Sequence, residues 1–361
     1  MQKVVCFHIL NDYSGSPKVL KNVLAGLSEC NMPIDLITSR GGVLDELKAK
    51  KNIQFFYFSY KFSENQIVTL LRYTVVQLYL FFFSFKYLFQ KNTVFYINTI
   101  LPVGAALAGR TMGKKVVYHY HENAFIKSAF YRILCKIMLV IASDIICVSE
   151  YQRNFLSRTK NVTVIPNTLP EEFTNQFTPS PQNSFEQKTV LMLSSLRLYK
   201  GTLEFIELVG RLPQYKFELV INDTQVSIKE FLMKHQIEKL NNLIIYERQN
   251  DVVPFYKRAS IVLNLSDKKR FIETFGLTVV EAMTAGLPVI VPTQGGIAEM
   301  VEDGVNGYKI DIQELNKIEN HINVILSDFE LYQKLSENAL KMAKNYDSKN
   351  VTDRILQIIE S

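Results

Sequence analysis

The strongest constraint on the fold is an alternation, repeated along the whole chain, of short β-rich apolar runs and longer helix-like segments. In the first half the predicted strands are residues 4–9, 34–38, 53–58, 93–97, 115–119, 145–148 and 162–165. In the second half they are residues 190–194, 217–221, 243–246, 261–265, 289–291 and 308–310. Strands that alternate with helices form βαβ units, in which helices cover both faces of a parallel sheet. Two such series predict an α/β protein with two doubly wound parallel-sheet domains.

The junction between the two series lies where the chain becomes rich in proline and polar residues. Pro166-Asn-Thr-Leu-Pro170 ends the first series, and the next residues are rich in Pro, Ser, Asn and Gln, as linkers are. A chain of 361 residues also exceeds the usual size of one hydrophobic core. The sequence therefore predicts an N-terminal domain over 1–168, a linker over 169–188 and a second domain over 189–345. A helix over 346–361 is a candidate to pack back on the N-terminal domain.

Charge is distributed unevenly between the two halves. Residues 1–168 carry 20 Lys and Arg against 9 Asp and Glu, whereas the remainder carries 21 against 26. The basic half is expected to face an anionic surface, for which membrane lipid and nucleic acid are both candidates. Four scattered cysteines without a CxxC pair argue against structural zinc or a disulfide framework and fit a reducing cytosol. The first ten residues read as a buried strand rather than a signal peptide.

One stretch, residues 67–89, is unusually rich in apolar and aromatic side chains. Its uninterrupted part is 13 residues long, whereas a helix that crosses a bilayer needs about 20. Two interpretations stay open. The stretch lies where a βαβ unit needs a crossover helix, so it can be buried. It can also lie in a membrane interface, with aromatic contacts from Tyr79, Phe81, Phe82, Phe83 and Phe85. A second run, 127–142, carries Arg132 and Lys136 one turn apart and would add a basic, lipid-facing patch.

Two carboxylates eight positions apart make a candidate ligand site in the second half. Glu273 and Glu281 bracket a small-residue turn and the start of a predicted helix. The backbone N–H groups of Phe275, Gly276 and Leu277 would be unpaired at the helix N-terminus, where phosphate binds favourably. The carboxylates would accept hydrogen bonds from sugar or ribose hydroxyls. The segment is a candidate site for an anionic ligand that carries hydroxyls, and a surface loop that leads into a core helix is the alternative.

Two cations follow the first strand of the second domain. Arg197 and Lys200 lie in the turn between that strand and a helix that starts near Gly201. The guanidinium of an arginine can bind two phosphate oxygens, while a lysine acts as a mobile point charge. At a helix N-terminus the pair is predicted to bind a diphosphate and to stabilise it as a leaving group. A solvated basic turn is the alternative.

Together these patterns resemble glycosyltransferase family 4. The strand-Arg-x-x-Lys-Gly turn at 197–201 precedes the Glu-x7-Glu segment, which continues as Glu281-Ala-Met-Thr-Ala-Gly-Leu-Pro288. Gly295-Gly-Ile-Ala-Glu299 and Asp303-Gly-Val-Asn-Gly307 follow, and Val164-Ile-Pro-Asn167 closes the first domain. The resemblance covers nearly the whole chain. It implies a GT-B fold, with two Rossmann-like domains facing across a cleft, the N-terminal one for the acceptor and the C-terminal one for a nucleotide sugar.

The resemblance implies a role for each matching residue. The expected catalytic residues are Glu273, His121, Arg197 and Lys200. Glu273 would meet the hydroxyls of the donor sugar, while Arg197 and Lys200 would hold the diphosphate. His121 looks like the family's histidine near the C6 side of the sugar and the acceptor. The expected donor-binding residues are Gly15, Arg197, Lys200, Phe275, Gly276, Leu277 and Glu281, of which Glu281 would bind the ribose.

The chain departs from the family pattern in two places. Many members carry Gly-Arg five or six residues before the Lys-Gly, where this chain has Ser194 and Ser195, so Arg197 is the cation instead. The loop after the first strand is Ser-Gly-Ser-Pro rather than Gly-Gly-rich, which leaves Gly15 alone to supply a free φ angle.

The sequence predicts an enzyme without a metal ion or other cofactor. His119 and His121 share one face of a strand, but Glu122 would point the other way. No Asp-x-Asp motif of a metal-dependent sugar transferase follows a strand. Arg197, Lys200 and helix N-termini would take the place of the metal.

The resemblance implies transfer of a hexosyl unit, with retained configuration, from a UDP- or GDP-sugar to an acceptor hydroxyl. The expected acceptor is a lipid-linked or other saccharide in the synthesis of a bacterial surface polysaccharide such as lipopolysaccharide or capsule. An anionic membrane surface is the expected partner rather than nucleic acid, which would leave the carboxylate segment unexplained. The protein is expected in the cytoplasm, peripheral on the inner face of the cytoplasmic membrane. A GT-B sugar-nucleotide 2-epimerase and a non-catalytic subunit that binds nucleotide sugar are the alternatives.

Overall fold

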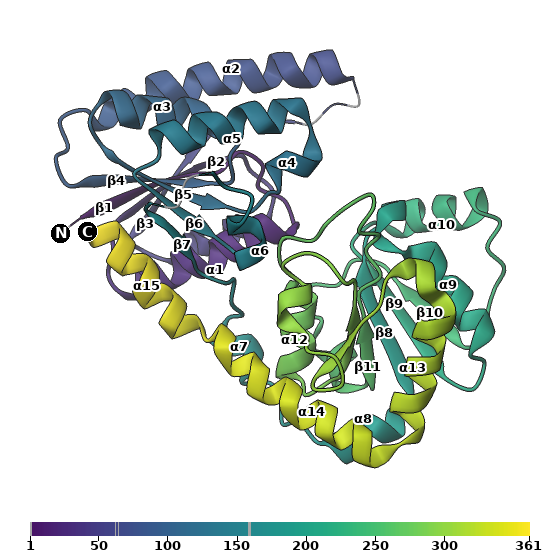
Figure 1. The fold of residues 1–361 in the computed structure, drawn as a ribbon. Helices are drawn as coiled ribbons and strands as arrows, with labels where there is room; N and C mark the ends of the chain where they lie inside the picture. Colours follow the sequence, from purple (N-terminus) through teal and green to yellow (C-terminus); the bar gives the residue numbers. More distant parts are fainter. Residues whose placement is uncertain (1, 62, 64, 158–159) are drawn as a thin grey trace. The chain divides into compact units, whose positions relative to one another are not determined.

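The computed structural model describes residues 2–61, 63, 65–157 and 160–361. The chain divides into two compact units. Unit 1 comprises residues 1–168 and 348–361, and unit 2 comprises residues 169–347. Each unit is built around its own parallel sheet (Figure 1).

The described residues of unit 1 form a parallel sheet in the order β3-β2-β1-β4-β5-β6-β7. The strands are β1 (Lys3–Phe7), β2 (Ile34–Thr38), β3 (Ile53–Tyr57), β4 (Thr93–Asn98), β5 (Lys115–Tyr120), β6 (Asp144–Cys147) and β7 (Val162–Val164). The central strands are almost entirely buried because helices cover both faces of the sheet, which explains their near-continuous apolar sequences. The order reverses at β1, which pairs with β2 on one side and with β4 on the other.

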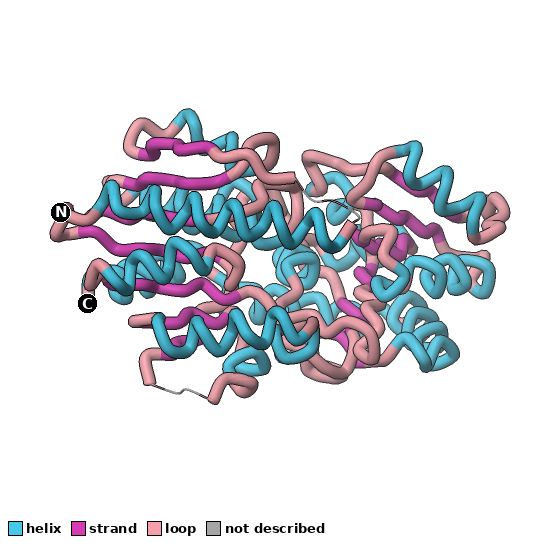
Figure 2. The backbone as a smooth tube through the Cα atoms, turned by 90° about the horizontal axis from the view of Figure 1, so that it is seen from above, coloured by secondary structure: helices cyan, strands magenta, loops and turns pink. Residues whose placement is uncertain are grey.

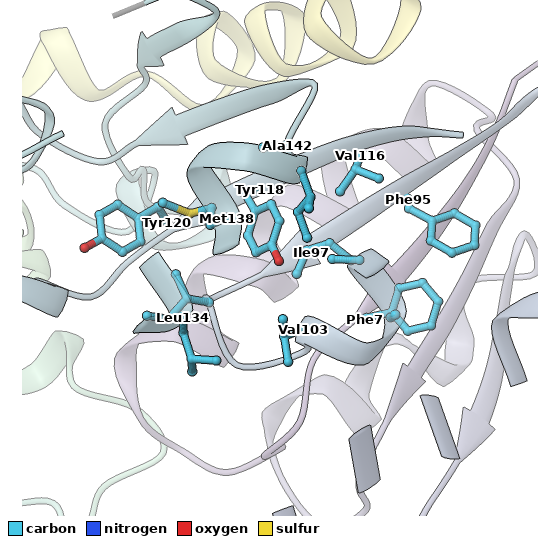
Figure 3. Close-up of a cluster of buried hydrophobic side chains, with 14 of the residues drawn as sticks. Phe7, Phe95, Ile97, Val103, Val116, Tyr118, Tyr120, Leu134, Met138 and Ala142 are labelled. Atoms are coloured by element: carbon cyan, nitrogen blue, oxygen red, sulfur yellow. The ribbon is translucent and has the colours of Figure 1, made fainter. Parts of the chain in front are cut away.

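Two groups of helices cover the sheet of unit 1, one on each face (Figure 1). One face carries α2 (Gln66–Ser84), α3 (Val103–Thr111) and α5 (Ala129–Ile141). The other face carries α1 (Gly15–Glu29) and α15 (Ser348–Glu360). The short helices α4 (Ala124–Lys127) and α6 (Glu150–Arg153) follow β5 and β6. Figure 3 shows part of the buried cluster of this unit, formed by Phe7, Phe95, Ile97, Val103, Val116, Tyr118, Tyr120, Leu134, Met138 and Ala142.

The C-terminal helix α15 packs within unit 1. It lies so close to α1 that a Cβ at Gly26 would come within 2.4 Å of Oγ1 of Thr352. Arg354 donates a hydrogen bond to the carbonyl oxygen of Val164 at 2.6 Å. Residues 348–361, at the far end of the chain, therefore belong to the same compact unit as residues 1–168.

The described residues of unit 2 form a second parallel sheet, in the order β10-β9-β8-β11-β12-β13. Its strands are β8 (Thr189–Ser194), β9 (Lys216–Ile221), β10 (Leu243–Tyr246), β11 (Ile261–Leu263), β12 (Val289–Val291) and β13 (Gly307–Lys309). Its helices are α7 (Glu171–Thr174), α8 (Pro181–Gln187), α9 (Thr202–Arg211), α10 (Gln225–Lys234), α11 (Val253–Lys257), α12 (Leu277–Thr284), α13 (Leu315–Ser327) and α14 (Phe329–Ala343). This sheet also reverses its order once, at β8, which lies between β9 and β11.

Residues 169–188, predicted as a linker, contain α7 and α8 and lie within unit 2. The sequence carries a helix-start signal there that its polar composition obscured, because Ser180 caps α8 and Pro181 occupies the first turn. Phe185 of α8 packs its ring at 5.3 Å from the ring of Tyr332 in α14. The rings of Phe173 and Phe177 lie 6.3 and 6.5 Å from the ring of Tyr256, so three aromatic side chains anchor a segment that is mostly polar.

α2 is the crossover helix between β3 and β4, and it has one buried and one exposed face. Tyr73, Val76, Leu80 and Ser84 are buried, whereas Tyr79, Phe82 and Phe85 are exposed. By length and composition, Gln66–Tyr87 is the one helix in the described part of the chain that could cross a membrane. Of its most apolar 18-residue stretch, 22% is buried. Figure 2 shows it as the long helix that lies over the strands of unit 1. The inner face of this helix therefore agrees with the buried-crossover interpretation of residues 67–89, and the membrane-interface interpretation stays a prediction for the outer face. Of the aromatics expected at the membrane, Phe81 and Phe83 are only partly exposed, and Phe83 packs against the core of unit 1.

Candidate active site

The candidate residues of unit 2 follow the carboxyl ends of two adjacent strands. The order of the sheet reverses between β8 and β11, and open parallel sheets bind ligands at such a point. The turn after β8 carries Arg197 and Lys200, and the segment after β11 leads to Glu273 and then to α12. The topology therefore brings two segments that are far apart in the sequence to one edge of the sheet.

Lys200 and Glu273 are in direct contact at this edge. Nζ of Lys200 forms an ion pair with Oε1 of Glu273, and 23% and 15% of the two side chains are exposed. The same carboxylate oxygen accepts a hydrogen bond from Oγ of Ser266 at 3.0 Å. The ammonium of Lys200 lies 4.4 Å from the ring centroid of Phe271, which stacks on Tyr199. Two residues that the sequence predicts from separate motifs thus form one charged pair in a half-buried, aromatic setting.

Two glycines allow the loops around this pair to approach each other. Gly201 follows Lys200 with a φ angle of +76°, and a Cβ there would come within 2.3 Å of the carbonyl oxygen of Leu265. Gly295 has a φ angle of +111°, and its Cβ would come within 2.4 Å of the carbonyl oxygen of Glu273. The left-handed region and the close backbone both exclude a side chain at these positions. The backbone on either side of the ion pair therefore depends on glycine.

The start of α12 supplies amide groups that can bind an anion. The backbone N–H groups of Phe275, Gly276 and Leu277 donate to no acceptor in the described part of the chain. Unpaired amides at a helix N-terminus attract phosphate. Within the same helix, Glu281 accepts a hydrogen bond from the hydroxyl of Tyr256. Burial and the Glu281 carboxylate raise the pKa of Tyr256 well above its usual value, so the phenol stays a neutral donor to Glu281.

Arg197 differs from the other candidate residues of unit 2. Its side chain is exposed and forms no ion pair or hydrogen bond with the residues that the structure describes. Its carbonyl oxygen accepts a hydrogen bond from the N–H of Lys200 at 2.8 Å, which closes the turn. The structure thus places Arg197 on the turn that carries Lys200 without bringing its guanidinium to Glu273.

Ser266 and Tyr256 hold the two carboxylates, and neither is predicted from the sequence. Ser266 follows β11 in a short polar run, and Tyr256 lies in an apolar helix. Neither has a spacing that links it to Glu273 or Glu281. Only the tertiary contacts identify these two residues.

A second polar cluster lies in unit 1, at the carboxyl ends of β1, β4 and β5. Nδ2 of Asn98 lies 3.0 Å from Nδ1 of His8, and Oδ1 of the same amide lies 2.9 Å from Nε2 of His121. The rings of His119 and His121 lie 4.2 Å apart between centroids, and Nδ1 of His119 lies 2.7 Å from the hydroxyl of Tyr96. The side-chain amide of Asn98 therefore contacts both His8 and His121, and this contact fixes the position of His121. The sequence predicts His121 but gives no sign of the contact with Asn98.

The histidines of this cluster are neutral near physiological pH. Burial lowers the pKa of His8 to about 4 and the pKa of His119 to about 3. Burial, together with His119 and His8, lowers the pKa of His121 well below its usual value. His121 thus exchanges hydrogen bonds as an uncharged imidazole rather than acting as a cation.

Lowering the pH from 7.5 to 5 is expected to destabilise unit 1. The unfolded chain binds protons on His8 and His119 near pH 6.5, whereas the folded chain binds them only near pH 4 and pH 3. Stability is therefore lost as the pH falls below 6.5, by about 2 kcal/mol for each histidine at pH 5. Urea unfolding followed by circular dichroism at several pH values measures this loss. Replacing His235 and His321 by Gln, outside the cluster, should leave the loss unchanged, and a midpoint that does not depend on pH would contradict the expectation.

Gly15 does not have the backbone conformation that the sequence predicts. It is the first residue of α1, and its φ angle lies outside the left-handed region. An added Cβ would meet no atom within 4 Å. The prediction that Gly15 supplies a free φ angle is wrong, because the chain enters α1 through a backbone conformation that other residues also adopt.

The described residues contain no group of three or more His, Cys, Asp or Glu arranged to hold a metal ion. The carboxylate of Glu122, the nearest acidic neighbour of His121 in the sequence, is buried and accepts a hydrogen bond from the N–H of Ile100 at 3.3 Å. All four cysteines are free thiols.

Residues 175–342 match the family of group 1 glycosyl transferases. A sucrose synthase of Melioribacter roseus is 38% identical over 91 residues, which cover 24% of this chain and 12% of the synthase. An uncharacterized glycosyltransferase of Methanocaldococcus jannaschii is 25% identical over 264 residues, 72% of this chain and 71% of that protein. A poly(glycerol-phosphate) alpha-glucosyltransferase of Bacillus subtilis is 24% identical over 188 residues, 51% and 27% of the two chains. The chain thus spans only about an eighth of the sucrose synthase that it matches.

Solved structures match the chain from end to end. HepE of Anabaena, in complex with UDP and glucose, has a TM-score of 0.80 at 20% identity and covers 100% of both chains. WaaG, a glycosyltransferase involved in lipopolysaccharide biosynthesis, has a TM-score of 0.71 at 16% identity and covers 99% of both. The fold is GT-B. The GT-B fold that the sequence predicts is confirmed, and together with the family match it supports a glycosyltransferase.

Proposed function

We propose that this GT-B protein is a retaining glycosyltransferase that moves a hexosyl unit from a UDP- or GDP-sugar to an acceptor hydroxyl. The contact of Lys200 with Glu273, four residues before α12, carries the proposal. Lys200 and the unpaired amides of α12 offer positive charge to a diphosphate, and Glu273 offers acceptors to sugar hydroxyls. A structure of HepE in complex with UDP-glucose makes that donor the first to test.

In the proposed reaction, the bond between the anomeric carbon and the diphosphate oxygen breaks. A bond to the acceptor oxygen forms on the same face of the sugar, and the proton of the acceptor hydroxyl passes to the leaving diphosphate. Lys200, Arg197 and the amides of α12 stabilise the negative charge that develops on the diphosphate. Glu273 orients the sugar, and Glu281, held by Tyr256, orients the ribose. These groups are proposed to replace the metal ion that other sugar transferases use.

The proposed acceptor is a lipid-linked saccharide at the inner face of a bacterial cytoplasmic membrane. The surplus of Lys and Arg in residues 1–168 supports an anionic surface as the partner of unit 1. Among the matched proteins, WaaG is involved in lipopolysaccharide biosynthesis and the relative from Bacillus subtilis glucosylates poly(glycerol-phosphate). Bacterial surface polysaccharides are therefore the acceptors to test first.

A nucleotide-sugar screen by thermal shift tests the proposal. The correct donor should raise the melting temperature, because a ligand at a hundred times its Kd stabilises the fold by about 2.7 kcal/mol. Proton NMR of the anomeric position then follows the product with and without acceptor. A C2 epimer formed from the donor alone would show an epimerase, and donor binding without any product would show a binding subunit. If no nucleotide sugar stabilises the protein, the proposal is wrong.

Replacing Arg197 by Ala is expected to lower kcat/KM about tenfold, which is about 1.4 kcal/mol of transition-state stabilisation. The effect should be smaller than that of Lys200, because the exposed guanidinium must lose more hydration to reach a phosphate. Arg211→Ala, on the surface of α9 in the same unit, is the matched control and should change kcat/KM less than about twofold. An unchanged kcat/KM for Arg197→Ala would show that this residue does not touch the diphosphate.

A further inference from the structure

The outer face of α2 carries a continuous row of exposed apolar side chains. The row consists of Ile67, Leu71, Val75, Leu78 and Phe82 on α2, with Phe85 and Phe89 just beyond the end of the helix, and these seven residues form the α2 stripe. The spacing of three or four residues places the five residues within α2 on one face. Ile67 is 70% exposed, Phe82 is 67% exposed and Phe89 is 90% exposed. A long row of exposed apolar side chains of this kind marks an interaction site.

The helix cannot leave the sheet to cross a bilayer without breaking its buried contacts. The hydroxyl of Tyr73 donates a hydrogen bond to the carbonyl oxygen of Leu101 at 2.8 Å. The N–H of Gly104 in α3 donates to Oε1 of Gln77 at 2.8 Å. Just beyond the helix, the buried hydroxyl of Tyr87 donates to the carboxylate of Asp35 at 2.8 Å. Because its inner face is held in this way, α2 lies flat on unit 1 (Figure 2), and only its outer face is available to a partner.

The charges of residues 65–143, which include α2, α3 and α5, indicate the chemistry of the partner. Between Glu64 and Asp144 the sequence has a single acidic residue, Glu122, which is buried. The exposed cations of the same segment are Arg72, Lys86, Lys91, Arg110, Arg132 and Lys136. None of these six forms an ion pair with a carboxylate in the described part of the chain. Two of these cations, Arg132 and Lys136, lie on α5, one and three positions from the exposed Ile133. α5 contacts α2 through the rings of Phe130 and Tyr73.

We infer that this face of unit 1 binds the surface of an anionic lipid bilayer, with α2 parallel to the membrane and the α2 stripe at the acyl boundary. Apolar residues flanked by cations bind such a surface through both burial and charge. A second copy of this chain is a poor partner, because it would bring two sets of unpaired cations together. The inference rests on the proposed function only in that a lipid-linked acceptor gives the enzyme a reason to be there.

Cosedimentation with vesicles tests this inference. The probes are vesicles of phosphatidylglycerol mixed with phosphatidylcholine, and vesicles of phosphatidylcholine alone, at low and high salt. Leu78→Ser with Phe82→Ser removes apolar contact, and Arg132→Gln with Lys136→Gln removes charge. Val226→Ser with Met233→Ser is the matched control, because both side chains lie on α10 of unit 2 and are 65% and 71% exposed. Circular dichroism melting shows whether each variant is folded.

The wild type and the control are expected to sediment with the anionic vesicles, and more weakly at high salt. The stripe variant should bind at least about tenfold more weakly to either kind of vesicle. The charge variant should lose the preference for phosphatidylglycerol. A wild-type protein that stays in the supernatant at low salt would overturn the inference, and so would a folded stripe variant that binds like the wild type. A lipid-free dimer that the stripe variant abolishes would also overturn it, in favour of a second copy.

The donor screen separates this inference from the proposed function. If the protein binds vesicles but no nucleotide sugar, the membrane-binding inference stands and the proposed glycosyltransferase function is wrong. If UDP-glucose stabilises the protein but the protein does not bind vesicles, the proposed function stands and the membrane-binding inference is wrong.

Discussion

Replacing Lys200 by Ala is expected to lower turnover by about a hundredfold to a thousandfold, the usual effect of removing one group that stabilises developing charge. The ammonium is half-buried, so its charge acts on a diphosphate with less screening than an exposed lysine has. Glu273→Gln should have an effect of the same order, since the amide keeps the shape of the side chain but not its charge. Steady-state kinetics at saturating donor measure both variants.

Lys234→Ala, on the exposed face of α10 in the same unit, is the control and should have normal turnover. The two active-site changes should also be non-additive, because the side chains are in contact. If Lys200→Ala retains near-normal turnover while the protein binds its donor, Lys200 does not stabilise the leaving group. Additive effects of the two substitutions would show that the contact between Lys200 and Glu273 is not part of the mechanism.

Replacing Gly201 by Val is expected to destabilise unit 2 by about 3 kcal/mol or more. Valine strongly disfavours the left-handed backbone of this position, and its side chain would overlap the chain just after β11. Its Cβ would lie 2.3 Å from the carbonyl oxygen of Leu265, which cannot move without disturbing the segment after β11. Chemical unfolding followed by circular dichroism measures the loss, and activity should fall with it because Lys200 is the preceding residue.

Gly210→Ala is the matched control for this prediction. Gly210 lies in α9, the helix that Gly201 precedes, and an added Cβ there would meet no atom within 4 Å. Alanine at a helical glycine should stabilise the unit by about 0.5–1 kcal/mol. Equal effects of the two substitutions would mean that the turn after β8 does not constrain the fold.

The elements of this protein follow from its local sequence. All thirteen strands of the described chain lie where short apolar runs predict them, because strands covered on both faces need apolar side chains in nearly every position. The helix-start signal Ser180-Pro181 was present but was hidden by the polar composition around it. The small-residue loop predicts that Gly15 supplies a free φ angle, whereas the start of α1 gives it an ordinary one.

The candidate residues Glu273, Glu281 and Lys200 are also predictable from the sequence, because the two carboxylates bracket the start of α12 and Lys200 precedes the start of α9. Their supporting residues were not. Ser266, Tyr256 and Asn98 carry no local pattern that distinguishes them from other polar residues. Tyr256 and Asn98 bond partners more than twenty positions away, and Ser266 reaches Glu273 only through the fold of the loop after β11.

Local periodicity thus determined that this chain builds two parallel α/β sheets, since each strand and helix depends on side chains only a few positions apart. The tertiary structure alone decided which strand ends meet, and therefore that Lys200 contacts Glu273 and that Asn98 joins His8 to His121. It also decided which face of α2 is covered, because a helix that is apolar on all sides can pack against a sheet through any of its faces.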